Sequence, residues 1–246
     1  MHCRDARIML KLNKVKSGNN KGGNKVMKRI KIFLAVLCVF TVSVAFAGCG
    51  NSFDPVAAVE AEMELLTTGT VPEDADDLYS EDLKTVQSEY DKEFQAEVDA
   101  LVKELDCAAY AEGDRRAKVE KFCRELFAKC KYEVSQDYTE KDDTYLVDVT
   151  IEPVDFAPII SKVSENGEFV QKWKDKISSG EYTVTSEEQL MTDLYDDLFD
   201  YLSAEIDKAG YAKAETITLK LKDNGKGVYN ISQDQTDKLA EMLFSF

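Results

Sequence analysis

The side chains of this chain that could do chemistry are mostly carboxylates and thiols. Its 246 residues include 47 Asp and Glu and six Cys but a single histidine, His2. A Ser-His-Asp or Cys-His catalytic arrangement needs an imidazole, and so does a histidine-ligated zinc or iron site. The sequence after His2 therefore excludes these mechanisms, and we expect no cofactor.

Three cysteines in the interior of the chain, Cys107, Cys123 and Cys130, form an odd-numbered set without a metal-binding pattern. No Cys-x-x-Cys occurs, so neither a metal site nor a thioredoxin-like motif is indicated. Cys123 and Cys130 are expected about 10 Å apart along one helix, which is too far for a disulfide. A bridge from Cys107 stays open, but buried thiols that pack as small apolar side chains are favoured.

Cys49 stands in a different setting, directly after a basic and then an apolar segment. Lys28-Arg29-Ile30-Lys31 is followed by 16 uncharged residues, 32–47, which are too few for a membrane span of about 20. This order is typical of an export signal. Phe46-Ala47-Gly48-Cys49 resembles a bacterial lipobox, in which the first residue is commonly Leu. The resemblance implies a diacylglyceryl group on the Cys49 sulfur and cleavage before Cys49.

The export signal divides the chain into four parts. Residues 1–26 carry seven bases and one acid, which suits a basic tail, but Lys21-Gly22-Gly23 could be encoded by a ribosome-binding sequence ahead of Met27. We therefore interpret 1–26 as an untranslated extension and 27–48 as a lipoprotein signal peptide. Residues 49–53 are then the lipidated cysteine with a short tether. Residues 54–246 are expected to form one domain.

Removal of residues 1–48 makes the chain strongly acidic. Ten of the 31 Lys and Arg and one of the 47 Asp and Glu lie in that segment, which leaves 21 bases, 46 acids and a net charge of −25. Such a polyanion repels nucleic acid and anionic lipid headgroups. Calcium or a basic protein or peptide would be a better partner, and solubility alone is the plain alternative.

Four of the acids have a spacing that could serve binding. Asp193, Asp196, Asp197 and Asp200 fall at i, i+3, i+4 and i+7, so they share one face of an expected helix. We treat them as a candidate acidic face for a cation or a basic partner. The chain has no Asp-x-Asp-x-Asp-Gly loop, so an EF-hand is excluded.

The elements that must position these residues follow from the apolar periodicity. Helices are predicted from Asp54-Pro55 to Gly69, from Leu83 to Leu105 and from Gly113 to Cys130. Alternating residues predict two hairpins, 132–138 with 145–151 and 217–221 with 228–231, the second joined through Asp223-Asn224-Gly225. Helical segments at 159–163, 168–177 and 186–209 lie between the hairpins, and a last helix runs from Ser232 to Phe246. The predicted fold is α+β, with N-terminal helices packed on an antiparallel sheet of two hairpins, a helical insertion and a C-terminal helix.

Three stretches carry a family resemblance. They are Asp54-Pro55 opening a helix after the cysteine, the run from Tyr145 to Asp155, and Asn230-Ile231-Ser232 leading into 239–244. Together they resemble small clostridial-type lipoproteins that carry a domain of unknown function, often related to NTF2-like or cystatin-like folds. The resemblance implies a curved sheet against helices with room for an apolar cavity. It brings no catalytic motif.

A cleft is predicted where the helical insertion meets the sheet. Trp173 is the only tryptophan, and we expect it at the cleft edge, because the insertion supplies apolar surface that the strands do not require for packing. Its helical spacing with Phe169, Val170 and Ile177 leaves open that it belongs to the core or to a lid that packs on the sheet. Tyr145 and Tyr229 could supply hydroxyls at the rim. A small apolar ligand would suit such a site.

Two functions remain from these observations. The first is a lipid-anchored binding or interaction module at the outer face of the cytoplasmic membrane of a Gram-positive-type bacterium. The second is an envelope hydrolase that uses carboxylates alone. The first is favoured over an enzyme because the sequence contains no nucleophile motif and no histidine after the signal.

Overall fold

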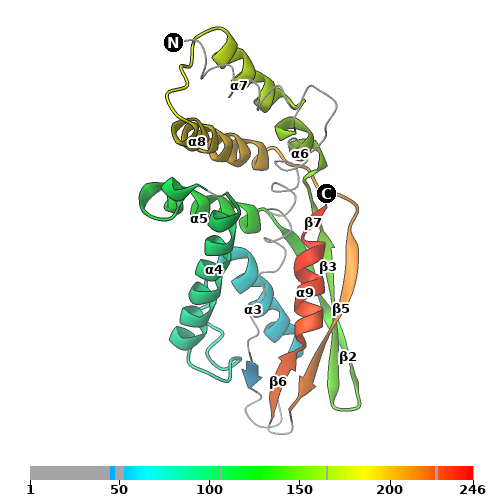
Figure 1. Cartoon of the computed structure of the whole chain (residues 1–246). Helices are drawn as coiled ribbons and strands as arrows, with labels where there is room; N and C mark the ends of the chain where they lie inside the picture. Colours follow the sequence, from blue (N-terminus) through cyan, green and yellow to red (C-terminus); the bar gives the residue numbers. More distant parts are fainter. Residues whose placement is uncertain (1–44, 48–52, 106, 165, 225–226, 246) are drawn as a thin grey trace.

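The computed structural model of the chain describes residues 45–47, 53–105, 107–164, 166–224 and 227–245, and it has the mixed α+β architecture that the sequence predicts. Five antiparallel strands form the main sheet in the order β1-β6-β5-β3-β2 (Figure 1). They are β1 (Ala45–Ala47), β2 (Lys131–Lys141), β3 (Thr144–Glu152), β5 (Glu215–Asp223) and β6 (Val228–Ile231). Both predicted hairpins, β2 with β3 and β5 with β6, are therefore confirmed.

The first hairpin is longer than the sequence suggested. The polar residues 139–144 were expected to form its connection, but β2 continues to Lys141 and β3 begins at Thr144. Asp142 and Asp143 alone make the turn, with φ angles of 51° and 55°. A two-residue turn with both φ angles positive matches the twist of the paired strands, and Asp tolerates this conformation better than most residues.

The second hairpin is short on one side, and a side chain completes it. β6 ends at Ile231, which leaves part of β5 without a neighbouring strand on that edge. Gln235 fills the gap, because its side-chain amide donates to the Thr218 carbonyl (3.0 Å) and accepts from the Lys220 N–H (3.1 Å). Helix α9 (Gln233–Met242) therefore begins against the edge of β5.

The remaining helices follow the predicted order. They are α3 (Pro55–Thr68), α4 (Leu83–Leu105), α5 (Gly113–Ala128), α6 (Ala157–Val163), α7 (Glu168–Ser178) and α8 (Glu187–Ile206), with a short 3-10 helix η1 (Ala108–Tyr110) before α5. The predicted cap of α3 is confirmed, since the Asp54 carboxylate accepts from the N–H groups of Val56 and Ala57 (both 3.1 Å). Ser186 caps α8 in the same way through the Gln189 N–H. None of the helices in the described residues is long and apolar enough to cross a membrane.

The end of the chain differs from the prediction. The last helix was expected to reach Phe246, which lies outside the described residues, but α9 stops at Met242. Phe244–Ser245 instead form β7, which pairs in parallel with β4 (Val154–Asp155). The Phe244 ring packs 5.7 Å from both Phe127 and Phe156. Burial of this ring outweighs the local preference for one more helical turn.

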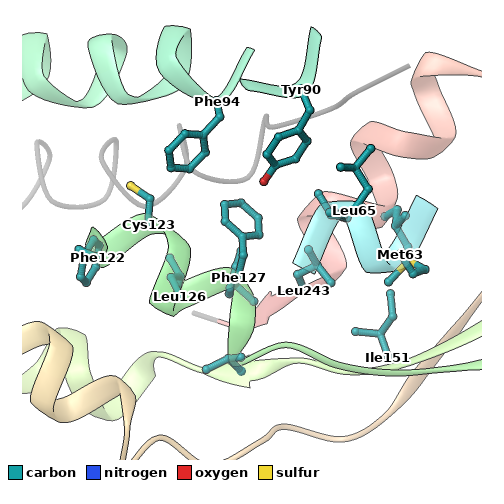
Figure 2. Packing of buried hydrophobic residues seen from close by; sticks show 14 of the residues in the cluster. Met63, Leu65, Tyr90, Phe94, Phe122, Cys123, Leu126, Phe127, Ile151 and Leu243 are labelled. Carbon is teal, nitrogen blue, oxygen red and sulfur yellow. The ribbon is translucent and has the colours of Figure 1, made fainter. Parts of the chain in front are cut away.

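The core lies between the sheet and three helices. α3 packs on β2 and β3, and α5 packs on α3, α4 and α8. Figure 2 shows Met63 and Leu65 of α3, Tyr90 and Phe94 of α4, and Phe127 of α5 pointing toward one another above Ile151 of β3. In the described part of the chain, Cys107, Cys123 and Cys130 make no disulfide with one another, and Cys123 is buried in this core.

Substitution of Gly69 tests the junction between α3 and α4. Gly69 ends α3 with φ 72°, and a Cβ there would lie 2.5 Å from Arg124 Nη1 and 3.0 Å from Tyr90 Oη. We expect Gly113→Ala, the matched control, to lower the free energy of unfolding by about 1–2 kcal/mol in chemical denaturation, because Gly113 has φ 69° but no described atom within 4 Å of a Cβ. Gly69→Ala should lower it further, because the contacts with Arg124 and Tyr90 add to the same backbone cost. Equal losses for the two variants would show that Arg124 moves aside freely.

Candidate functional site

The four predicted acids do lie on α8, but each of their carboxylates already has a hydrogen-bond or ion-pair partner. Asp196 accepts from Tyr110 Oη (2.7 Å) and forms an ion pair with Arg115 Nε (3.0 Å). Asp200 pairs with Lys118 Nζ at 2.8 Å. Tyr110 belongs to η1 and the two bases belong to α5, so this part of the face joins α8 to the N-terminal helices.

The other two acids of the face contact α7 and the segment that follows it. Asp197 pairs with Lys176 Nζ of α7 at 3.3 Å. Asp193 accepts from Gln189 Nε2 (2.6 Å) and from Tyr182 Oη (2.7 Å), and these hydrogen bonds lower the pKa of its carboxyl. In the part of the chain that the structure describes, no group of three or more Asp, Glu, Cys or His side chains is arranged to hold a metal ion. The acids thus connect α8 to its neighbours.

A shallow depression lies beside the acidic face. It has a volume of about 450 Å³ and is lined by Ala109, Glu112, Asp114, Arg115, Lys118 and Asp196. Its walls carry both signs of charge, and the ion pair between Arg115 and Asp196 crosses it. This polar depression is not the apolar cleft that the sequence predicted.

Trp173 does not lie at an open cleft edge. Its side chain is only 4% exposed, with the Tyr182 ring 5.0 Å away in edge contact and Lys176 Nζ 5.1 Å from the ring centroid. The prediction that Trp173 lies at the edge of a cleft is therefore wrong. Trp173 fills the space between the backbone of α7 and Tyr182, where its large ring contributes to packing.

Tyr145 and Tyr229 lie far from Trp173. Figure 1 shows α7 at one end of the molecule and β6, which carries Tyr229, at the other. The two tyrosines instead surround Phe53: its ring stacks on Tyr229 at 4.0 Å and 11°, and the Tyr145 centroid is 5.5 Å away. Tyr138, 49% exposed, packs edge-on against Tyr145. We call Phe53, Tyr138, Tyr145 and Tyr229 the aromatic cluster.

The aromatic cluster is next to a strand that sequence reasoning missed. Residues 45–47 belong to the predicted export signal, yet they form β1 at the edge of the sheet, with Phe46 opposite Tyr229. On its other side β1 bonds to a loop, through Ala47 N–H to the Leu78 carbonyl (2.7 Å) and Ser80 N–H to the Ala45 carbonyl (2.8 Å). Ala-Phe-Ala does alternate, but three residues are too few to predict a strand.

Phe46 is buried against the loop that follows α3. Its side chain is fully buried and stacks on Tyr79 with the ring centroids 5.4 Å apart. We define the β1 slot as the space between residues 228–230 of β6 and residues 78–80 of the loop. Backbone groups line both sides of this slot, and the Tyr79 ring forms its apolar wall.

Two buried polar atoms are found beneath this part of the fold. Within the described residues, Glu62 Oε2 of α3 and Tyr79 Oη have no hydrogen-bond partner. Glu62 is 5% exposed, and burial, with a smaller contribution from Glu93, raises its pKa to about 8. With a pKa of about 8, Glu62 is mostly protonated at neutral pH. Burial raises the pKa of Tyr79, and so does the Glu62 carboxylate once it has ionised at higher pH.

The carboxylates with raised pKa do not form a hydrolytic pair. Burial raises the pKa of Glu62, Glu93 and Glu97, which lie on α3 and α4 and do not line the depression. An acid and a base for glycoside hydrolysis must both reach the substrate. Glu62 is closed off by the core, so this arrangement does not favour the hydrolase alternative.

Comparison with known proteins gives a fold but no family. No protein-family model matches the chain, and no curated protein matches it. Among solved structures, a candidate lipoprotein from Bacillus subtilis, YcdA, is similar with a TM-score of 0.54 at 17% sequence identity. The likeness covers 78% of this chain and 56% of that one, so this chain matches little more than half of its length. At this identity the likeness shows a shared fold, and the NTF2-like or cystatin-like relation stays a prediction.

Substitution of Glu62 should change how stability depends on pH. Between about pH 4.5 and pH 8 the folded chain holds a proton on Glu62 that the unfolded chain releases, so raising the pH through this range weakens folding. Each unit of pKa difference corresponds to about 1.4 kcal/mol. We expect Glu62→Gln to unfold at a higher temperature than the wild type at pH 8, with little of this gain left at pH 4.5.

The matched control for this experiment is Glu64→Gln. Glu64 is on the same helix but exposed, so at pH 8 its substitution should change the unfolding temperature much less than that of Glu62 does. A constant difference between Glu62→Gln and wild type from pH 4.5 to pH 8 would contradict a raised pKa at Glu62.

Proposed function

We propose that this protein is a lipid-anchored binding module of the bacterial cell envelope. The single observation that carries the proposal is Phe46-Ala47-Gly48-Cys49 at the end of an export signal, a few residues ahead of the first helix of the domain. The diacylglyceryl group on Cys49 would hold the domain at the outer face of the cytoplasmic membrane of a Gram-positive-type bacterium. The shared fold with a candidate lipoprotein of Bacillus subtilis supports this proposal.

The anchor would be strong enough to act alone. Two acyl chains hold a protein stably, since each buried methylene contributes about 0.8 kcal/mol and one chain binds only marginally. The chain itself would add no electrostatic attraction, because the 46 acids against 21 bases after residue 48 repel anionic headgroups. The lipid and not the charge would thus determine the location.

The tether places one end of the sheet near the bilayer. Phe53 lies four residues after Cys49, a reach of about 14 Å at full extension. Its ring is fixed between Tyr145 and Tyr229, so the aromatic cluster would lie close to the headgroups. Tyrosine, with an apolar body and a polar tip, suits this interface. α7 and α8, at the opposite end of the molecule, would face away from the membrane (Figure 1).

Binding is favoured over hydrolysis for this domain. The acids of α8 are held by Tyr, Lys and Arg partners, and the carboxyl with the largest rise in pKa is closed off by the core. A basic protein or peptide remains a partner that suits the net charge. Calcium and a small apolar ligand, which the sequence also allows, stay predictions.

The anchor is tested by substitution of Cys49 in a bacterium that processes lipoproteins. Cys49→Ser should abolish labelling with a fatty-acid analogue and leave a precursor that is larger than the mature protein. Cys38→Ser is the matched control, because Cys38 lies in the same signal but not at the cleavage position. It should be labelled and cleaved as the wild type is. Normal labelling of Cys49→Ser would end the lipoprotein proposal.

A further inference from the structure

The β1 slot contains a segment that lipoprotein processing removes. Cleavage before Cys49 releases residues 45–47 together with the rest of the signal. The Leu78 carbonyl and the Ser80 N–H, which bond to β1, would then lose these partners. So would the edge of β6 opposite Ala45, Phe46 and Ala47. Unpaired backbone groups beside a vacant apolar pocket are unfavourable in a folded protein.

We propose that the mature protein binds an extended peptide in the β1 slot, as an added strand between β6 and the loop 78–80. This inference rests on the proposed function, because only cleavage before Cys49 vacates the slot. The four residues left ahead of Phe53 begin with the lipidated cysteine, which is held in the bilayer. The occupant is therefore a segment of another protein.

The chemistry of the slot specifies that segment. Strand addition takes its affinity from main-chain hydrogen bonds and its specificity from pockets for alternate side chains. The slot offers hydrogen bonds on both sides of a three-residue strand. Its central position holds the Phe46 ring, which is buried and stacked on Tyr79, while Ala45 and Ala47 on either side are small. The ligand is thus an extended segment with an aromatic residue between two small ones.

The location of the slot suits such a partner. Phe46 is opposite Tyr229, and the Tyr229 ring stacks on Phe53. The slot therefore adjoins the aromatic cluster at the tethered end of the domain. A segment that emerges from the membrane, or from a protein held at it, would reach this site. The excess of acids on the domain would further favour a segment flanked by basic residues.

Peptide binding to the lipidated, mature protein tests the proposal. The protein is purified in detergent from a lipoprotein-processing host, and its mass shows whether the chain begins at Cys49. The probe is a fluorescent peptide of sequence Val-Ala-Phe-Ala-Gly. Its binding is measured by fluorescence anisotropy, with empty micelles as the blank. We expect the mature protein to bind it and to bind Val-Ala-Ala-Ala-Gly at least about tenfold more weakly, because the ring stack on Tyr79 is lost.

Two protein variants locate the site. The unprocessed Cys49→Ser precursor keeps residues 45–47 in the slot, so it should not bind the probe. Ser80→Pro removes the N–H that bonds to the strand, and it should weaken binding at least about fivefold. Ser80→Ala keeps this N–H and should bind as the wild type does. Thermal unfolding of each variant confirms that it is folded.

The outcomes separate this proposal from the function on which it rests. A mature mass that still includes residues 45–47 would contradict the lipoprotein proposal. A chain that begins at Cys49 but does not bind the probe would leave that proposal intact and overturn this one. Equal binding by the Cys49→Ser precursor, or by both peptides, would also overturn it. If Ser80→Pro does not fold, two comparisons still test the proposal: one between the two peptides, and one between the precursor and the mature protein.

Discussion

Burial of the apolar surface of α5 is the interaction on which the rest of this structure depends. Phe122 packs 5.6 Å from Phe199 of α8, and Phe127 packs 5.7 Å from Phe244 of β7. Other faces of the same helix contact α3 and α4, and α3 in turn covers β2 and β3. Each such ring contributes about 1.5–3 kcal/mol when buried. The insertion and the sheet are thus held together through one helix, and the polar contacts of α8 are formed around that packing.

The charged contacts of α8 show why composition alone was a poor guide to binding. A run of four Asp on one face suggests a site, yet their partners come from η1, α5, α7 and the segment after α7. Glu205, on the same helix, is paired with both Lys162 and Lys208. Such partly exposed pairs contribute little stability individually, but they fix the orientation of neighbouring helices.

The sequence predicted most elements, because their signals are local. The Asp54-Pro55 cap, the alternation along β3 and the Asn224-Gly225 turn signal each concern a few consecutive residues. What it missed depends on partners distant in the chain: β7 forms because Phe244 packs on Phe127 and Phe156, and β1 because 45–47 meet β6. The candidate cleft was predicted least well. The structure places Trp173 far from Tyr145 and Tyr229, because periodicity cannot show which apolar residues of different elements share one pocket.

The outer edge of the sheet would have a consequence for a domain that is tethered to a membrane, as proposed above. Tethered molecules share a thin layer above the bilayer, where they meet far more often than when they are free to diffuse in three dimensions. A long, regular edge strand would then promote polymerisation of the domains. β2 is a long edge strand of 11 residues, but its pairing with β3 shifts between Val134 and Tyr138, and charged side chains lie along it at Lys131, Glu133, Asp137, Glu140 and Lys141. On a tethered domain, this irregular and charged edge would oppose the pairing of sheets from neighbouring molecules.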